Sequence, residues 1–139
     1  MYFEIKIKVE KENDKGSLKV SKEVYLVDAL SFTEVEATIG KEIRDLYSDF
    51  LIETIKKTRY QEIVASTLET DDKYFKVRVD LVTFDDEKNR ETRNPIYFLV
   101  EASNPENANS YIKEHLKGSI SDYEIVSIIE TKILDIFNY

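Results

Sequence analysis

The chain contains no cysteine and only one histidine, His115, in 139 residues. Without cysteine, disulfide bonds and thiolate metal sites are excluded, and the redox compartment stays undetermined. A single imidazole cannot supply a multi-histidine metal site. Its charged neighbours Lys113 and Glu114 indicate a solvated helix residue rather than a member of a catalytic triad.

Long apolar runs are also missing. No stretch approaches the roughly 18 residues that a membrane-spanning helix needs. Residues 1–4 begin an alternating strand at once, without the basic region and apolar core of a signal peptide. The sequence therefore predicts a cytoplasmic protein that does not associate with a membrane.

Glycine is scarce, with Gly16, Gly40 and Gly118 as the three examples. We interpret them as a turn, a close approach of a helix to a sheet, and a left-handed helix stop. Neither of the glycine-rich phosphate-binding motifs occurs, and H-E-x-x-H is absent as well. The acidic clusters at 69–72 and 85–87 lack the spacing of a calcium loop, so we interpret them as solvated turns. The sequence predicts no enzyme, no cofactor and no metal.

The net charge is −8. Proteins that bind duplex DNA are usually basic as a whole, so this balance argues against that class. An acidic surface more often serves solubility. Only a local basic patch would support nucleic-acid binding.

What the sequence does have is an internal repeat. Residues 2–9, YFEIKIKV, return as residues 74–81, YFKVRVDL. Further matches relate residues 27–29 to 100–102, 48–50 to 121–123, and 58–63 to 131–136. A duplication predicts a pseudo-two-fold architecture. It also favours a binding surface with two related faces over a single catalytic centre.

The first copy predicts a β-β-α-β unit. Residues 2–10 alternate between apolar and polar side chains, and residues 19–28 form the return strand. Ser31 and Glu34 make a capping box, and the helix that follows has an apolar stripe of Val35, Ile39, Ile43 and Leu46. Residues 50–55 form a third strand, with a short extension at 60–64.

The second copy repeats this order. Residues 74–84 and 96–101 are expected strands, joined by a charged hairpin loop at 85–94. Residues 103–106 repeat the helix cap, with Pro105 in the first turn. Ala108, Tyr111, Ile112 and Leu116 form the apolar stripe of the helix. Residues 125–130 are the last full strand, and residues 133–137 are its extension.

These units predict an α+β fold. We expect two pseudo-symmetric β-β-α-β repeats, about 1–66 and 73–139, in one domain spanning 1–139. Residues 65–73 form the linker. Because this linker is short, we expect the repeats to share one mostly antiparallel sheet with both helices on one face. The other face is then wet or a binding surface.

The repeated first strands carry the strongest candidate site. Their outward positions are Tyr2, Glu4, Lys6, Lys8 and Tyr74, Lys76, Arg78, Asp80. If the two strands lie side by side, two tyrosines meet four cations in an acidic chain, a combination suited to single-stranded nucleic acid. Lys56, Lys57 and Arg59 would extend the track, with Lys132 at the equivalent position. The alternative is an ordinary exposed strand face, on which lysines prevent edge aggregation.

The C-terminal residues 135–139 are acidic and aromatic, as in tails that recruit partners of bacterial single-strand binding proteins. Because residues 133–137 align with 60–64 of the first copy, we favour a docked strand over a free tail.

The string from Tyr25 to Glu34, YLVDALSFTE, followed by Glu36 and Ala37, is fairly specific. Together with the Tyr-Phe-Glu start and the closing residues 130–139, it resembles an uncharacterised family of about this length, a domain of unknown function in gut bacteria and their tailed phages. The resemblance spans nearly the whole chain. Members commonly have tryptophan at position 2 and prolines near 132 and 138, where this chain has Tyr2, Lys132 and Asn138. The resemblance implies no activity, and its phage connection favours DNA transactions or interference with host proteins only by association.

The sequence thus favours a non-catalytic binding module, a homodimer or part of an assembly. Its most concrete form binds single-stranded nucleic acid through the residues named above. The alternative is an acidic protein-interaction adaptor or inhibitor without nucleic-acid binding.

Overall fold

A computed structural model describes residues 1–47, 49–120 and 122–139 of the chain. Ser48 and Ser121, which correspond in the repeat, lie outside the described residues. The elements in chain order are β1 (Tyr2–Glu12), β2 (Leu18–Asp28), α1 (Phe32–Arg44), β3 (Phe50–Lys57), β4 (Tyr60–Val64), β5 (Lys73–Asp85), β6 (Arg90–Ala102), α2 (Pro105–Leu116), β7 (Tyr123–Glu130) and β8 (Ile133–Asn138). The predicted α+β fold with a repeated β-β-α-β arrangement is confirmed.

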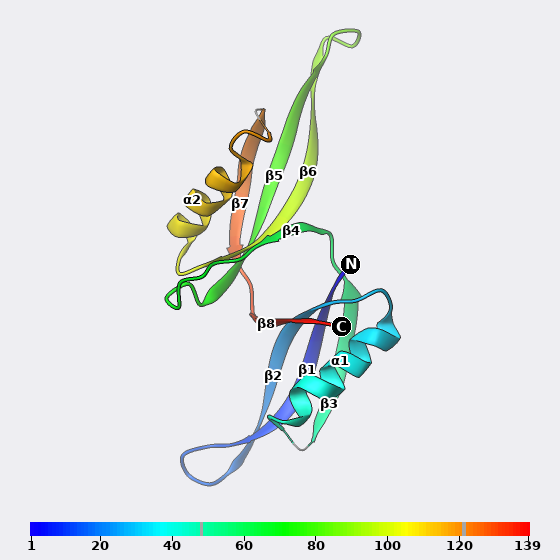
Figure 1. Cartoon of the computed structure of the whole chain (residues 1–139), viewed down its shortest axis with the longest axis vertical. Helices are drawn as coiled ribbons and strands as arrows, with labels where there is room; N and C mark the ends of the chain where they lie inside the picture. Colours follow the sequence, from blue (N-terminus) through cyan, green and yellow to red (C-terminus); the bar gives the residue numbers. More distant parts are fainter. Residues whose placement is uncertain (48, 121) are drawn as a thin grey trace. The chain divides into compact units, whose positions relative to one another are not determined.

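The chain forms two compact units (Figure 1). Unit 1 comprises Met1–Thr58 and Lys132–Tyr139, and unit 2 comprises Arg59–Thr131. Each unit has one four-stranded sheet, with the order β3-β1-β2-β8 in unit 1 and β4-β6-β5-β7 in unit 2. The pairings are antiparallel except for β2–β8 and β4–β6. The expectation of a single sheet is wrong. The first strands of the two repeats, β1 and β5, each have strands of their own repeat on both sides, so they do not pair with each other. The single domain spanning 1–139 stays a prediction.

Each repeat gives its last strand to the other unit. β4 follows β3 in the chain but pairs in parallel with β6, and β8 follows β7 but pairs in parallel with β2. Thr58 and Thr131 mark the two crossovers. The Thr58 amide and hydroxyl donate to the Tyr2 carbonyl at 2.9 and 2.8 Å, and Thr131 makes the same two bonds to the Tyr74 carbonyl. The expected short extensions are therefore separate strands that complete the sheet of the partner repeat.

The core of each unit lies between its sheet and its helix. In unit 1 the inward row of β1 is buried: Phe3, Ile5, Ile7 and Val9. α1 buries Val35, Ile39 and Ile43 against this row, as the sequence predicted. The equivalent core of unit 2 contains Phe75, Val77, Val79, Phe98, Ala108, Ile112 and Leu116. Burial of each apolar side chain contributes about 1.5–3 kcal/mol, so these rows supply most of the driving force for folding.

Two details of α1 differ from expectation. Leu46 lies beyond the end of the helix and is 64% exposed, so it does not belong to the apolar stripe. A Cβ atom added at Gly40 would meet only the Arg44 guanidinium, at 4.0 Å. Gly40 therefore does not mark a close approach of α1 to the sheet.

The helix ends follow the local sequence. The Ser31 hydroxyl oxygen accepts from the Glu34 amide at 3.3 Å, as a cap requires. In α2 the cap is Asn104, whose side chain accepts from the Asn107 amide at 2.8 Å, with Pro105 following. Gly118 has φ +82°, the left-handed stop that the sequence predicted.

The charged segment at 85–94 is mostly strand. β5 continues to Asp85 and β6 begins at Arg90, so residues 86–89 alone form the turn. The Asp85 carboxylate accepts from the amides of Glu87 and Lys88 at 3.1 and 3.3 Å. Polar cross-strand pairs such as Thr83 and Thr92 extend this hairpin without the apolar alternation that usually identifies a strand.

The linker at residues 65–72 lies within unit 2 and is fastened by Asp71. Asp71 is 4% exposed, and the hydroxyls of Ser66 and Tyr111 donate to its carboxylate at 2.5 and 2.8 Å. The expectation that this acidic cluster is solvated is wrong for Asp71. The Ser66 hydroxyl, together with Tyr111, holds the pKa of Asp71 below its usual value, although burial opposes this shift.

This lowered pKa predicts a loss of stability in acid. An aspartate in the unfolded chain has a pKa of about 3.9. The stabilisation from Asp71 is therefore fully present above that pH and is lost as the pH falls through the lower folded pKa. We expect Asp71→Asn to be less stable than the natural chain at neutral pH, and its urea midpoint to change less between about pH 5 and pH 3.

Asp72→Asn is the matched control, because Asp72 is the exposed neighbour. It should keep the pH dependence of the natural chain. Equal slopes for Asp71→Asn and the natural chain would contradict this role of Asp71.

Candidate functional site

The outer face of the sheet in unit 1, opposite α1, carries the predicted row of β1. Tyr2, Glu4, Lys6 and Lys8 are half-buried and alternate with the buried apolar row. β2 and β3 add Lys22 and Lys56 to the same face, because Lys22 is the register partner of Lys8 and Lys56 that of Glu4. Directly paired residues of neighbouring strands project from the same face of a sheet.

A bulge in β3 places Glu53 among these lysines. Lys6 pairs with Thr54 and Ile7 with Ile52, which leaves Glu53 as the extra residue. Its carboxylate lies 3.2 Å from the Lys22 ammonium and 3.8 Å from that of Lys8. A hydrogen bond from Lys22 and the charges of Lys22, Lys8 and Lys6 hold the pKa of Glu53 below its usual value.

We call the following set the lysine face: Lys6, Lys8, Lys22 and Lys56 with Glu4 and Glu53. Lys56 lies 3.0 Å from the Glu4 carboxylate. Within this set four cations and two anions sum to +2, and Glu10 and Glu12 follow Lys8 on the same row of β1, in a chain whose net charge is −8. The lysine face is thus a cluster of cations bordered by carboxylates.

Two of the predicted cations lie elsewhere. Lys57 is the register partner of Phe3, a core residue, so it projects from the opposite face to Lys56. Arg59 is exposed and begins unit 2. The predicted track of Lys56, Lys57 and Arg59 therefore does not form one face, since adjacent residues of a strand alternate in direction.

The equivalent positions of unit 2 have a different character. Tyr74 is buried, with 9% exposure, and its ring is therefore not an open stacking platform. The Lys76 ammonium lies 4.9 Å from the centre of the Tyr97 ring. Arg78 contacts the buried Asp80 at 3.0 Å. β1 and β5 lie in different sheets, so the expectation that these two strands lie side by side in one sheet is wrong.

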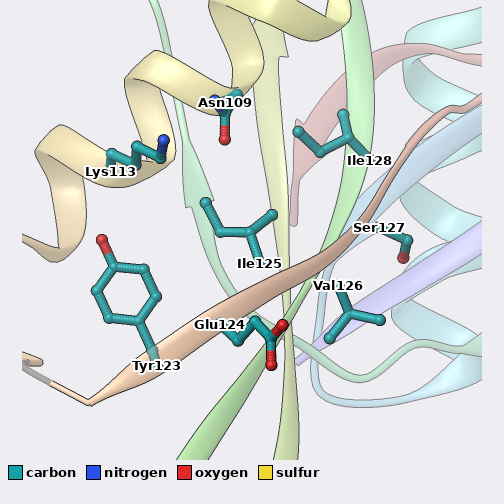
Figure 2. Close-up of a pocket in the computed structure, with 8 residues that line it drawn as sticks. All are labelled: Asn109, Lys113, Tyr123, Glu124, Ile125, Val126, Ser127 and Ile128. Carbon is teal, nitrogen blue, oxygen red and sulfur yellow. The ribbon is translucent and has the colours of Figure 1, made fainter.

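Unit 2 instead has two open grooves that the sequence did not predict. The larger, about 770 Å³, lies between α2 and β7 and is lined by Asn109, Lys113, Tyr123, Glu124, Ile125, Val126, Ser127 and Ile128 (Figure 2). The second, about 450 Å³, is lined by Val82, Phe84, Glu91, Arg93, Asp122, Tyr123 and Glu124. The available sequence signal was β7 itself, which is apolar on both of its faces.

A buried carboxylate lies on the α1 side of the sheet in unit 1. Glu23 is 6% exposed, and the Lys11 ammonium approaches it to 3.6 Å. The Tyr25 hydroxyl donates to Glu23 at 3.4 Å, and burial, together with the charge of Glu23, raises the pKa of Tyr25. The contact of Lys11 with Glu23 ties β1 to β2 in this long hairpin, which is a structural role.

The histidine of the chain lies in a surface contact with a carboxylate. His115 Nε2 lies 2.9 Å from the Glu62 carboxylate on the surface of unit 2. Among the described residues, no group of three or more His, Asp or Glu side chains is placed to hold a metal ion. In the same part of the chain, no helix is long and apolar enough to cross a membrane.

The C-terminal segment is a docked strand, as predicted. Ile133 is 4% exposed, and the Phe137 ring stacks on Tyr25 with 5.3 Å between centres. The Tyr139 amide donates to the Asp28 carbonyl at 3.1 Å. Residues 135–139 are therefore part of unit 1 and not a free recruitment tail.

Comparison with known proteins places the chain in a family. A sequence model of that family matches residues 1–139. The chain belongs to the DUF4494 family, a domain of unknown function. No curated protein and no solved structure matches the chain. Membership in DUF4494 brings no activity with it, so the function has to be argued from the surfaces described above.

Proposed function

We propose that this DUF4494 protein is a non-catalytic binding module that holds single-stranded nucleic acid on the lysine face of unit 1. The observation that carries the proposal is the cluster of four lysines on one face of a sheet in a strongly acidic chain. Lysine ammonium groups at the surface of a sheet can follow a flexible phosphate backbone without reading its sequence.

The charge balance of the lysine face determines the expected mode of binding. Glu53 holds Lys8 and Lys22, and Glu4 holds Lys56, through ion pairs of 3.0 to 3.8 Å. Exposed pairs of this kind are worth at most about 1 kcal/mol, so phosphates can compete for the ammonium groups. Tyr2 lies at the end of the same row and is half-buried. The resemblance to phage proteins supports a role in DNA transactions by association only.

This function predicts strongly salt-dependent binding. If four lysines each contact one phosphate, the slope of log affinity against log salt is about −2.8 for a single strand. The affinity for a fluorescent single-stranded oligonucleotide should then fall about 50-fold between roughly 50 and 200 mM salt. Fluorescence anisotropy measures this directly.

Charge reversal locates the surface. The double variant Lys6→Glu/Lys8→Glu should weaken binding by about tenfold or more and halve the salt slope. Lys57→Glu is the matched control, because Lys57 projects from the opposite face of the same sheet. Equal losses for both variants, or no binding by the natural chain at low salt, would contradict the proposal.

A second candidate is an acidic adaptor or inhibitor that does not bind nucleic acid. The smaller groove of unit 2 favours it, because Glu91, Asp122 and Glu124 surround one arginine there and Phe84 is 61% exposed. Such a groove suits a basic segment with an apolar residue. In that case oligonucleotides do not bind at any salt concentration, and a basic partner is released by salt.

A further inference from the structure

The outer strand β7 forms one edge of the sheet in unit 2 and carries no lysine. Among the described residues, β7 is the last strand of its sheet and pairs with β5 alone. Two of its large apolar side chains are open to solvent, Val126 at 46% and Ile129 at 57% exposure. In the corresponding strand β3, the last two positions are Lys56 and Lys57. Lysines of this kind keep the edge of a sheet from pairing with another chain, and β7 has Ile129 and Glu130 in their place.

A bulge determines which side chains of β7 share a face. Arg78 pairs with Ser127 and Val79 with Ile125, so Val126 is the extra residue. Tyr123 and Ile125 before the bulge, and Ile128 and Glu130 after it, consequently lie on the α2 side of the sheet. Figure 2 shows Tyr123, Ile125 and Ile128 on the side of the strand that faces Asn109 and Lys113 of α2.

We propose that β7 pairs antiparallel with β7 of a second copy of the chain, with the two-fold axis between Val126 and Ser127. In this register Ile125 lies opposite Ile128 of the second copy, and Tyr123 lies opposite Glu130 of the second copy. Both pairs match in face, because the bulge shifts the two halves of the strand by one residue. The same shift of one residue brings the free backbone N–H and C=O groups of one β7 opposite those of the other β7. The eight-stranded sheet that results has no β7 edge.

Charge complementarity supports this occupant over an unrelated strand. Lys113 lines the α2–β7 groove beside Tyr123. In the proposed register Glu130 of the second copy arrives opposite Tyr123 and so approaches Lys113, and symmetry makes this contact twice. Among the described residues of its own chain, Glu130 pairs with Lys73 at 3.7 Å, and both side chains are exposed. Lys73 therefore competes only weakly with Lys113 of the second copy for the Glu130 carboxylate.

The dimer is tested by sedimentation equilibrium of the natural chain and charge variants. Lys113→Glu and Glu130→Lys should each weaken the dimer by about tenfold, because each creates two like-charge contacts. The double variant Lys113→Glu/Glu130→Lys restores opposite charges and should return to within about threefold of the natural chain. Lys117→Glu, an exposed residue of the same helix end outside the groove, is the matched control and should change nothing.

A third variant tests the strand itself. Val126→Lys places two lysines beside the axis and should leave only monomer, while circular dichroism shows the fold retained because Val126 is an exposed position. A natural chain that is monomeric at high concentration would overturn the proposal. So would a dimer that Val126→Lys leaves intact, or single charge reversals that the double variant does not rescue. None of these readouts depends on the lysine face of unit 1.

Discussion

Replacing Phe137 with alanine is expected to lower the free energy of unfolding by about 2–4 kcal/mol, although this residue lies two positions from the end of the chain. Complete removal of a buried phenylalanine side chain costs about 3–5 kcal/mol. Phe137 is half-buried, so the expected loss is smaller. Its ring packs on the core of unit 1 and stacks on Tyr25, which belongs to the first repeat.

The part of the fold that the Phe137→Ala variant loosens is as informative as the amount of stability it loses. β8 covers one side of β2 through the register Tyr25–Asp135 to Asp28–Asn138. Loosening β8 should therefore expose the backbone amides of β2 to hydrogen exchange, while those of β6 keep their protection. Urea unfolding gives the magnitude, and amide exchange gives the location.

Tyr139→Ala is the matched control. Tyr139 is an aromatic residue of the same segment, but it is 71% exposed. Its replacement should change stability by no more than about 0.5 kcal/mol. Equal losses for Phe137→Ala and Tyr139→Ala, or faster exchange in β6 instead of β2, would contradict the docking of β8 on unit 1.

Much of the fold could be predicted from the sequence because its elements are local. The alternation in residues 2–9 and its return at 74–81 identify two central strands, and the caps at Ser31 and Asn104 identify two helices. Alternation of apolar and polar residues indicates a strand with one buried face. The hairpin at 85–94 was predicted as a loop, and the strand residues within it were missed because their cross-strand contacts are polar.

The exchange of β4 and β8 could not be predicted in the same way. Residues 58–59 and 131–132 separate each last strand from the one before it, and such short breaks fit a continued strand as well as a crossover. Thr58 and Thr131 hold the chain at these points through bonds to the carbonyls of Tyr2 and Tyr74. These contacts join residues more than fifty positions apart, beyond the reach of any local pattern.

Part of the candidate site could be predicted from the local alternation of residues in β1. Alternation correctly assigned Lys6 and Lys8 to the face opposite the helix. It does not report which neighbours on one face form ion pairs or which side chains become covered, so the ion pair of Arg78 with Asp80 and the burial of Tyr74 were not visible. Glu53 entered the lysine face only through a bulge, which shifts a strand without a clear sequence signal.

The two proposed surfaces lie in different units and have separate tests. The lysine face belongs to unit 1, and the β7 edge belongs to unit 2. Changes at Lys6 and Lys8 should therefore leave the dimer intact. Conversely, Val126→Lys should leave intact the binding of one oligonucleotide by each chain.

The central claim is that each repeat completes the sheet of the other, and paired cysteines test it most directly. The natural chain has no cysteine, so only introduced thiols react. Asp28 and Asn138 are register partners in the exchanged arrangement. Neighbouring strands lie about 4.8 Å apart, which suits a disulfide. Glu101 is the equivalent of Asp28 in the second repeat and would face Asn138 if β8 stayed with its own repeat.

On mild oxidation, Asp28→Cys/Asn138→Cys is expected to form an intramolecular disulfide in nearly every molecule, whereas Glu101→Cys/Asn138→Cys should form none. Intact mass and gel mobility distinguish a cross-linked monomer from a cross-linked dimer. A disulfide between positions 101 and 138 within one chain, with none between 28 and 138, would contradict the exchange of strands.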